Sequence, residues 1–358
     1  MKRTLRLLWI AVASVASIAP LARSAHAQAC NATTGSAPQD VILGPHGEQF
    51  YPQNTNCPDQ FVAPVCTGGI TLHWKDPQDP NGLTRYACAS SPAGGKNLPL
   101  VVFLHPSRIT TVDETFGGKP GSTPDTDLLA QSTTVKLNPK ETGYVLLMPQ
   151  GRCLTSPPTS SGNGSRFDVW YKDPVNNLDV RAVQQFIQQL ENRQTLDESL
   201  APETLPSSFA TVDVTRQYLM GWSDGVYLAH YLALEFPTQF ASVATFAGAD
   251  PFSRDPCPTP YPAVARKPPV MVVHSSCDPI ELCSNVEDWF TALRGQGWPT
   301  SALDDVITDT SHTQIQTACS QESATQQRSC PEAAHLEYAN PQLPTMFQWL
   351  GKSTAAGK

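Results

Sequence analysis

The chain has 358 residues, enough for one large domain or two smaller ones. Apolar residues make up 40% and charged residues 16%, an ordinary globular balance, and the formal net charge is −8. Because an acidic protein is a poor candidate for binding nucleic acid or an anionic membrane surface, neither class of partner is expected.

The chain begins with a pattern typical of an export signal. Three basic residues precede a short apolar stretch, and Ala25-His26-Ala27 forms a small-residue cleavage site. We therefore expect residues 1–27 to be a signal peptide and the mature protein to be secreted, to the extracellular space or the periplasm. The apolar stretch is short for a membrane span, so no membrane anchor is expected. Acylation of Cys30, as in a lipoprotein, is an alternative.

Ten cysteines in an exported chain indicate disulfide bonds. Their connectivity is not determined by the sequence, but pairing between near neighbours suggests a set of bridges: Cys30–Cys57, Cys66–Cys88, Cys277–Cys283, Cys319–Cys330 and, from the remainder, Cys153–Cys257. The sequence contains no C-x-x-C pair, no H-E-x-x-H, no G-x-G-x-x-G and no P-loop. No metal ion and no organic cofactor is therefore predicted.

The first part of the mature chain differs in composition from the rest. Residues 28–97 are polar and rich in proline, and they hold four cysteines. Alternating patterns at 69–76 and 83–90 predict two short strands. We interpret 28–97 as an N-terminal arm with the first strands, stapled by disulfides, ahead of a catalytic domain at 98–352.

From residue 98 onward, continuous apolar runs of strand length alternate with helical patterns. The runs are 98–106, 144–151, 216–225, 241–250 and 268–278, and the helical patterns are 178–193, 226–237, 283–297 and a terminal helix. Continuous apolar runs are typical of strands buried on both faces of a parallel sheet. The alternation predicts an α/β fold with a mostly parallel, doubly wound sheet and helices on both faces. The stretches 107–141 and 303–334 are expected to be long loops that form the walls of a site.

The third run leads directly into Gly221-Trp222-Ser223-Asp224-Gly225, the only G-x-S-x-G in the chain. A strand before this pentapeptide and a helix after it are the context of a nucleophile elbow, which exposes the serine hydroxyl on a sharp turn. The turn is tight enough that Cβ atoms at the two glycines would strike the neighbouring strand or helix. A simple Gly-Ser turn between strand and helix is the alternative.

A serine nucleophile requires a base and an acid. His335 lies late in the chain, just before the expected terminal helix, and is the favoured base; His312 is the alternative. Asp278 directly follows the fifth apolar run and is the favoured acid, with Asp250, after the fourth, as the runner-up.

The pieces "VVFLHP", "LLMPQG", "VWYKDPVNNLDVRAVQQFI", "YLMGWSDG", "FASVATFAG", "PPVMVVHSSCDPIE" and "AAHLEY" follow one another in this order. In order and spacing they resemble the α/β-hydrolase superfamily, and more narrowly the secreted feruloyl esterase and polyhydroxybutyrate depolymerase-like esterases. The resemblance implies an α/β-hydrolase fold and a catalytic triad of Ser223, Asp278 and His335. The chain departs from the family with His105-Pro106 in place of His-Gly, Val226 in place of the second elbow glycine, and His274-Ser275 in place of His-Gly.

We therefore expect a serine esterase that works through an acyl-enzyme. One oxyanion-hole donor is expected to be the amide of Asp224; because Pro106 has no N–H, the second is expected from Ser107, or else Arg108. Feruloyl or acetyl esters of cell-wall polysaccharides are the expected substrates, with a short-chain polyhydroxyalkanoate as the alternative. A binding protein that keeps the fold without catalysis, and a peptidase, are rival interpretations. Three aromatic residues are candidates for the pocket lining: Trp170, Tyr171 and Trp222.

Overall fold

The computed structural model describes a subset of the chain: residues 42–43, 49–50, 66, 68–77, 84–107, 124–155, 163–169, 172–195, 203–253, 260–319 and 324–355. The expected signal peptide and the predicted Cys30–Cys57 and Cys153–Cys257 bridges lie outside the residues that can be described.

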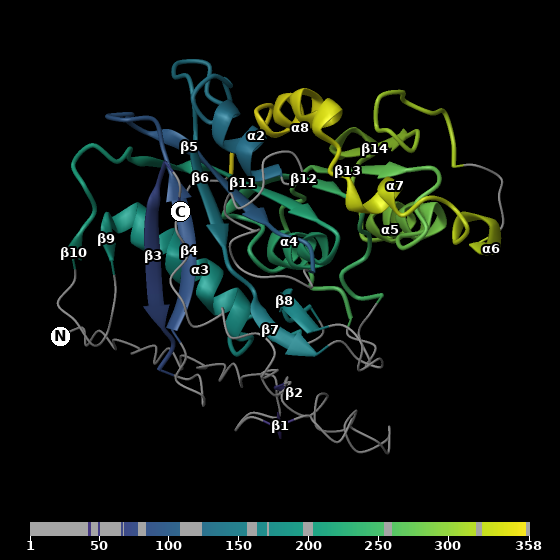
Figure 1. Ribbon diagram of the computed structural model, residues 1–358, viewed down its shortest axis with the longest axis horizontal. Coiled ribbons are helices and arrows are strands. Elements are labelled where there is room, and N and C mark those ends of the chain that lie inside the picture. Colours follow the sequence, from purple (N-terminus) through teal and green to yellow (C-terminus); the bar gives the residue numbers. More distant parts are fainter. Residues whose placement is uncertain are drawn as a thin grey trace, which may run out of the picture.

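One eight-stranded sheet organises the molecule (Figure 1). Its strand order is β14-β13-β12-β11-β5-β6-β4-β3, in which β14 to β6 pair in parallel, whereas β4 pairs antiparallel with both of its neighbours, β6 and β3. The mostly parallel sheet predicted from the apolar runs is therefore confirmed. The strands are β3 (Ile70–Lys75), β4 (Thr84–Ser90), β5 (Leu98–Leu104), β6 (Val145–Pro149), β11 (Val212–Trp222), β12 (Phe240–Phe246), β13 (Val270–Ser275) and β14 (Leu303–Thr308).

Strand β5 shows why the central strands read as continuous apolar runs. All seven of its residues are buried. Leu100 and Val102 face one hydrophobic cluster, whereas Val101 and Phe103 face another on the opposite side of the sheet. Because successive side chains point to opposite faces, a strand covered on both sides needs apolar residues at every position.

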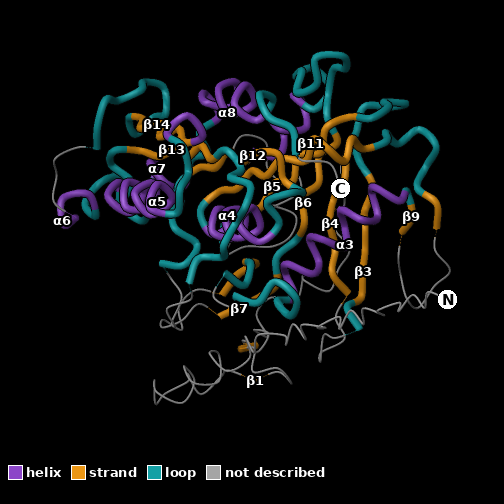
Figure 2. Tube along the Cα trace, turned by 180° about the vertical axis from the view of Figure 1, so that it is seen from behind, coloured by secondary structure: helices purple, strands orange, loops and turns teal. Residues whose placement is uncertain are grey.

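Helices cover both faces of this sheet, as Figures 1 and 2 show from opposite sides. On one face pack α3 (Leu178–Asn192), α4 (Asp224–Glu235) and α5 (Cys283–Gly295); on the other pack α2 (Pro124–Gln131) and α8 (Leu343–Leu350). The remaining elements are short: β1 (Ile42–Leu43), β2 (Gln49–Phe50), β7 (Arg152–Thr155), β8 (Asn163–Arg166), β9 (Gln194–Thr195), β10 (Glu203–Thr204), α6 (Ala324–Gln327), α7 (Ala333–Leu336) and two 3₁₀ turns, Thr300–Ala302 and Asn340–Gln342.

The predicted long loops are only partly loops. The stretch 303–334 begins with strand β14, which pairs in parallel with β13, and 107–141 contains helix α2. Strand β14 was missed because it lies at the edge of the sheet and carries Asp304 and Asp305, which interrupt an apolar pattern. Asp305 instead accepts a hydrogen bond from His274 Nε2 at 2.7 Å.

Three disulfides join described residues, and two of them differ from the expected pairing. Cys66–Cys88 is confirmed, but Cys277 pairs with Cys330 and Cys283 pairs with Cys319. The predictions Cys277–Cys283 and Cys319–Cys330 are therefore wrong. Pairing by short sequence distance failed here because Cys283 begins helix α5, which leads the chain away from Cys277, and the chain returns to both cysteines only after strand β14.

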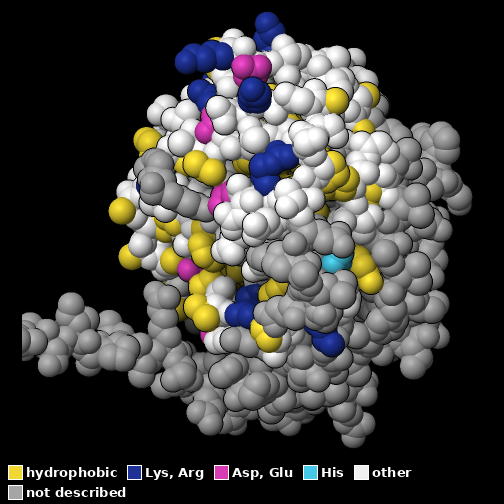
Figure 3. Space-filling view, turned by 90° about the vertical axis from the view of Figure 1, so that its left-hand side faces the viewer, with side chains coloured by type: hydrophobic (Ala, Val, Ile, Leu, Met, Phe, Trp, Pro, Cys, Tyr) yellow, Lys and Arg dark blue, Asp and Glu magenta, His cyan; other side chains and the backbone are white. Residues whose placement is uncertain are grey.

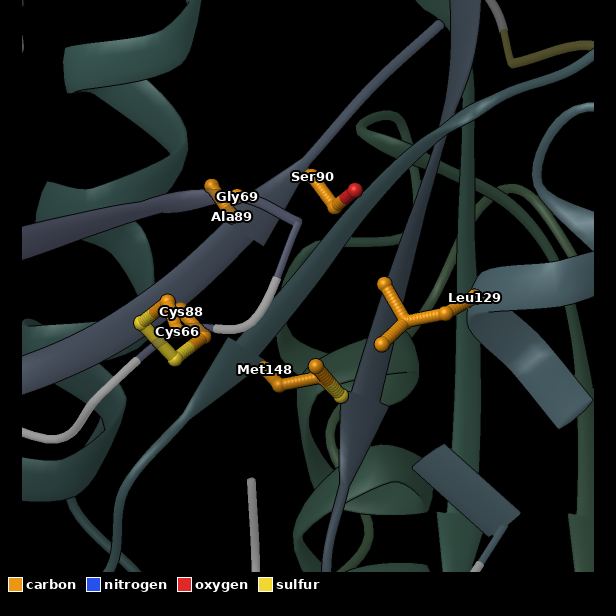
Figure 4. A pocket seen from close by; sticks show the side chains of 7 residues that line it. All are labelled: Cys66, Gly69, Cys88, Ala89, Ser90, Leu129 and Met148. Carbon is orange, nitrogen blue, oxygen red and sulfur yellow. A yellow bond between two sulfur atoms is a disulfide. The ribbon is translucent and has the colours of Figure 1, made fainter. Parts of the chain in front are cut away.

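A small hollow lies beside the Cys66–Cys88 bridge, between β4, β6 and α2 (Figure 4). Its lining includes Leu129, Met148 and Ser90. The Ser90 hydroxyl donates to the carbonyl of Gly68 at 3.0 Å, so it is engaged within the protein. The hollow lies on strands other than the one that carries Ser223.

On the face that Figure 3 shows, several lysine and arginine side chains lie near one another at the top, close to an acidic group, and the others are scattered below. Within the described ranges, no helix is both long and apolar enough to cross a membrane. The same residues contain no group of three or more His, Cys, Asp or Glu side chains placed to hold a metal ion.

Candidate active site

Ser223 occupies a strained turn between the end of β11 and the start of α4. Its backbone has φ 51° and ψ −117°, a conformation that residues other than glycine rarely adopt. Two hydrogen bonds hold the turn: Ser223 N–H donates to the carbonyl of Phe246 at 3.0 Å, and Val226 N–H donates to the carbonyl of Ser223 at 2.9 Å. This is the geometry of a nucleophile elbow, which the sequence context predicted.

The two elbow glycines are required by close backbone contacts. A Cβ atom on Gly221 would lie 2.7 Å from the carbonyl oxygen of Gly225, and one on Gly225 would lie 2.1 Å from the carbonyl oxygen of Leu104. Both distances are below the contact distance of a carbon and an oxygen atom. The elbow therefore closes only because these positions lack side chains, as the sequence analysis expected.

Val226 replaces the second elbow glycine of the family, and the structure shows what accommodates it. Its side chain packs against Gly248, where an added Cβ would lie only 2.4 Å from the Cβ of Val226. The position that lacks a side chain is thus Gly248, on the segment that faces the turn, instead of residue 226. The departure at Val226 leaves the elbow intact.

The structure brings the three predicted triad residues together. His335 Nε2 lies 2.8 Å from Ser223 Oγ, and His335 Nδ1 lies 2.8 Å from Asp278 Oδ2. Asp278 and His335 are buried, whereas Ser223 is partly exposed. The hydroxyl of a partly exposed serine thus contacts a buried imidazole, which contacts a buried carboxylate.

Hydrogen bonding indicates the tautomer of His335. The Asp278 carboxylate accepts N–H groups from Ile280 and Glu281 on its other oxygen, both at 2.8 Å, so its orientation is fixed. A carboxylate can only accept, so His335 Nδ1 carries the proton. Nε2 is then unprotonated and can accept the Ser223 hydroxyl proton.

Neither alternative residue takes part in this chain of contacts. The carboxylate of Asp250 accepts from the Tyr261 hydroxyl at 2.5 Å and from Phe252 N–H at 2.8 Å, and so stabilises its own loop. His312 is buried, and its Nδ1 lies 3.0 Å from Thr308 Oγ1. Burial lowers the pKa of His312, which favours a neutral, structural imidazole.

Further contacts join the segments that carry the three residues. Trp222 Nε1 donates to the carbonyl of His335 at 2.9 Å, and the Tyr227 hydroxyl donates to the Glu281 carboxylate. The Cys277–Cys330 bridge joins the residue before Asp278 to the segment that leads to His335. Sequence reasoning missed these contacts because each depends on two distant segments meeting.

The aromatic residues proposed to line a pocket are now partly placed. Trp222 is buried, and its ring packs against Phe246 and Tyr338 with centroid distances of 6.3 and 5.5 Å. It therefore belongs to the core beneath the site. Trp170 and Tyr171 lie outside the described residues.

The predicted oxyanion-hole segment lies against the elbow. The buried ring of His105 has Nδ1 2.7 Å from the carbonyl of Pro106, and its Nε2 accepts from Gly151 N–H at 2.9 Å. Because Nε2 accepts, Nδ1 carries the proton and donates to Pro106. Ser107 is exposed, and Asp224 is the first residue of α4, where the helix dipole favours negative charge.

His230, on the elbow helix, is packed in the core. Its ring stacks on Trp289 with a centroid distance of 5.4 Å, and its nitrogens contact the Ala249 carbonyl at 2.7 Å and Thr245 Oγ1 at 3.1 Å. Burial lowers the pKa of His230 from 6.5 to about 4. A histidine that is neutral when folded makes stability depend on pH.

We expect acid to destabilise the protein through His230. Above pH 6.5 the group is neutral in both states; as the pH falls toward 4, only the unfolded chain binds the proton, so the free energy of unfolding decreases by on the order of 3 kcal/mol. Urea unfolding of wild type and His230→Gln between pH 4 and 7.5 measures this contribution as the difference between the two curves. Parallel curves would contradict the account.

Comparison with known proteins supports the assignment of the fold. No protein-family model and no curated protein matches the chain. Among solved structures, a thermostable esterase aligns with a TM-score of 0.50 and 18% identity over 81% of this chain, which spans 64% of that esterase. An S-formylglutathione hydrolase from Agrobacterium tumefaciens aligns at TM-score 0.44 and 13% identity, over 81% of this chain and 98% of that one. At 18% identity, the alignment with the esterase establishes the α/β-hydrolase fold alone.

Proposed function

We propose that this protein is a serine hydrolase that cleaves carboxylic esters. The observation that carries the proposal is the contact of Ser223 Oγ, His335 and Asp278 in one hydrogen-bonded series at a strained elbow. The same constellation performs acyl transfer on several unrelated folds, so it is recognised by its geometry rather than by similarity.

In this mechanism Ser223 Oγ attacks the ester carbonyl while His335 Nε2 takes the hydroxyl proton. Asp278 stabilises the imidazolium that forms. His335 then gives the proton to the leaving alcohol, which leaves the acyl group on Ser223 Oγ. A water molecule, deprotonated by the same Nε2, attacks the acyl-enzyme, and the imidazolium returns this proton to Ser223 Oγ as the acid leaves.

The oxyanion of each tetrahedral intermediate needs two N–H donors, for which we propose the amides of Asp224 and Ser107. The contact at His105 supports the second. In a trans peptide the C=O and N–H groups point in opposite directions. Because His105 Nδ1–H holds the Pro106 carbonyl, it also fixes the direction of the Ser107 N–H.

We expect Ser107→Pro, which deletes the amide, to lose turnover by roughly 10²–10³-fold, the usual cost of one oxyanion donor. Ser107→Ala keeps the amide and is expected to retain activity. Turnover of a nitrophenyl ester measures the effect, after thermal melting has shown the proline variant to be folded. A folded, fully active Ser107→Pro would place the second donor elsewhere.

The Cys277–Cys330 bridge is expected to affect activity as well as stability. The double variant Cys277→Ala/Cys330→Ala frees the segment before His335 from the residue beside Asp278, so we expect kcat to fall roughly tenfold or more through misplacement of the base. The matched control, Cys66→Ala/Cys88→Ala, removes a bridge away from the site and is expected to lower only the melting temperature. Equal kcat values for the two folded double variants would contradict the expectation.

Our narrower proposal is a secreted esterase acting on feruloyl or acetyl esters of cell-wall polysaccharides. It is supported by the order and spacing of the sequence motifs, by the export-signal pattern and by the three disulfides, since disulfides persist in oxidising compartments. The same motifs also fit a polyhydroxybutyrate depolymerase.

A substrate screen separates these activities. Purified protein is assayed against nitrophenyl esters, methyl ferulate and acetylated xylan, and hydroxybutyrate oligomers. Hydrolysis of the feruloyl or acetyl substrates supports the narrower proposal, and hydrolysis of the oligomers alone would replace it with the depolymerase. If no ester is cleaved and Ser223 does not react with a serine-directed phosphonate, the protein is a non-catalytic member of the fold.

A further inference from the structure

His335, the base of the proposed mechanism, lies on a helix that is too short to hold it in place without other contacts. His335 is in α7, which has four residues. So short a helix contributes little stability of its own, because its nucleation is unfavourable. The carbonyl of His335 is also in the last turn, where helix carbonyls lack a partner within the helix.

Trp222 supplies the missing partner. Its Nε1–H donates to the His335 carbonyl at 2.9 Å, and both residues are buried. Trp222 is also the residue directly before Ser223, so one side chain joins the backbone of the nucleophile to that of the base.

Two aromatic residues hold the indole ring of Trp222 in place. The indole packs on Tyr338, which follows His335 by three residues, and on Phe246, whose carbonyl accepts the Ser223 N–H. Tyr338 and Phe246 contact each other edge-on with a centroid distance of 5.5 Å. A ring packed in this way has little freedom to follow a displaced histidine.

We propose that Trp222 is a positioning residue, which fixes the backbone of His335 while its imidazole exchanges protons between Ser223 and the leaving alcohol. The inference rests on the function proposed above. During the reaction the imidazole of His335 must change its hydrogen-bond partner at Nε2. The hydrogen bond at Nε2 therefore cannot hold His335 in place throughout. The backbone contact to Trp222 involves neither ring nitrogen and persists through every step.

The test compares two deletions of the same chemical group. Trp222→Phe removes the indole N–H at the site, and Trp349→Phe removes a buried indole N–H that donates to the Val243 carbonyl at 3.1 Å, away from the site. We expect kcat for a nitrophenyl ester to fall roughly ten- to a hundredfold in Trp222→Phe, with KM unchanged, and to be unchanged in Trp349→Phe. Benzothienylalanine at position 222, which replaces only the N–H by sulfur, repeats the test with the ring shape preserved should the phenylalanine variant fail to fold.

A second measurement does not depend on catalysis. The proton that His335 Nδ1 shares with Asp278 is followed by NMR, and we expect its low-field signal to broaden or vanish in Trp222→Phe but to persist in Trp349→Phe. If wild type shows the signal but cleaves no ester, loss of the signal in Trp222→Phe would support the positioning role and refute the proposed function. A folded Trp222 variant with wild-type kcat and an unchanged signal would overturn the inference.

Discussion

Ser223→Ala is expected to reduce ester hydrolysis by a factor on the order of 10⁴ or more, because the variant lacks the Oγ that lies beside His335 Nε2. The distance of 2.8 Å between these atoms lets the imidazole accept the hydroxyl proton as the bond to the ester carbon forms. Initial rates with a nitrophenyl ester measure the loss. A variant that keeps more than about a tenth of wild-type turnover would exclude Ser223 as the nucleophile.

Ser223→Gly provides a control that removes the nucleophile without lowering the stability of the protein. Serine at φ 51° is strained, and glycine adopts this backbone at little cost. We expect Ser223→Gly to be inactive and yet at least as stable as wild type, since relief of about 1–3 kcal/mol of strain opposes the greater entropy of the unfolded chain. Inactivity with raised or unchanged stability separates the loss of the nucleophile from a loss of folding.

His335→Ala is expected to lower activity nearly as much as Ser223→Ala, because the members of a triad act as one unit. Removal of the imidazole leaves the serine hydroxyl without a base. The double variant Ser223→Ala/His335→Ala is expected to be no less active than either single variant, which steady-state kinetics can measure. If the losses of the two single variants instead added in activation free energy, so that the rate factors multiplied in the double variant, the two residues would act independently.

His312→Ala is the matched control for the base. His312 is also a buried histidine late in the chain, but it contacts Thr308 rather than Ser223. We expect the variant to be less stable, because it removes a buried ring that packs on Phe246, and to retain its activity per folded molecule. Loss of catalysis in folded His312→Ala, with His335→Ala still active, would reverse the assignment.

The sequence allowed much of the central sheet to be predicted because burial on both faces leaves continuous apolar runs. The predicted runs contain strands β5, β6 and β13 in full and all of β12 except its first residue, but they extend two to four residues past the C-terminal ends of these strands. Strand β14 could not be recognised, because at the edge of the sheet its aspartates are tolerated and the apolar pattern is lost.

The meeting of Ser223, Asp278 and His335 could be anticipated because parallel strands end at one edge of a sheet, where the loops that follow them converge. The side-chain contacts between those loops could not. The Trp222 bond to His335 and the Cys277–Cys330 bridge join positions far apart in sequence, and no local pattern marks such partners. Pairing between near neighbours was a plausible rule for the cysteines, and strand β14 made it fail.

Covalent labelling tests the central claim most directly, since it requires a hydroxyl activated by a base but no knowledge of the natural ester. Native protein is treated with a fluorophosphonate and analysed by peptide mass spectrometry, with His335→Ala as the comparison. We predict one adduct per chain, on the peptide that contains Ser223, and very slow labelling in His335→Ala. A native protein that stays unlabelled, or that is labelled at another residue, would contradict the account.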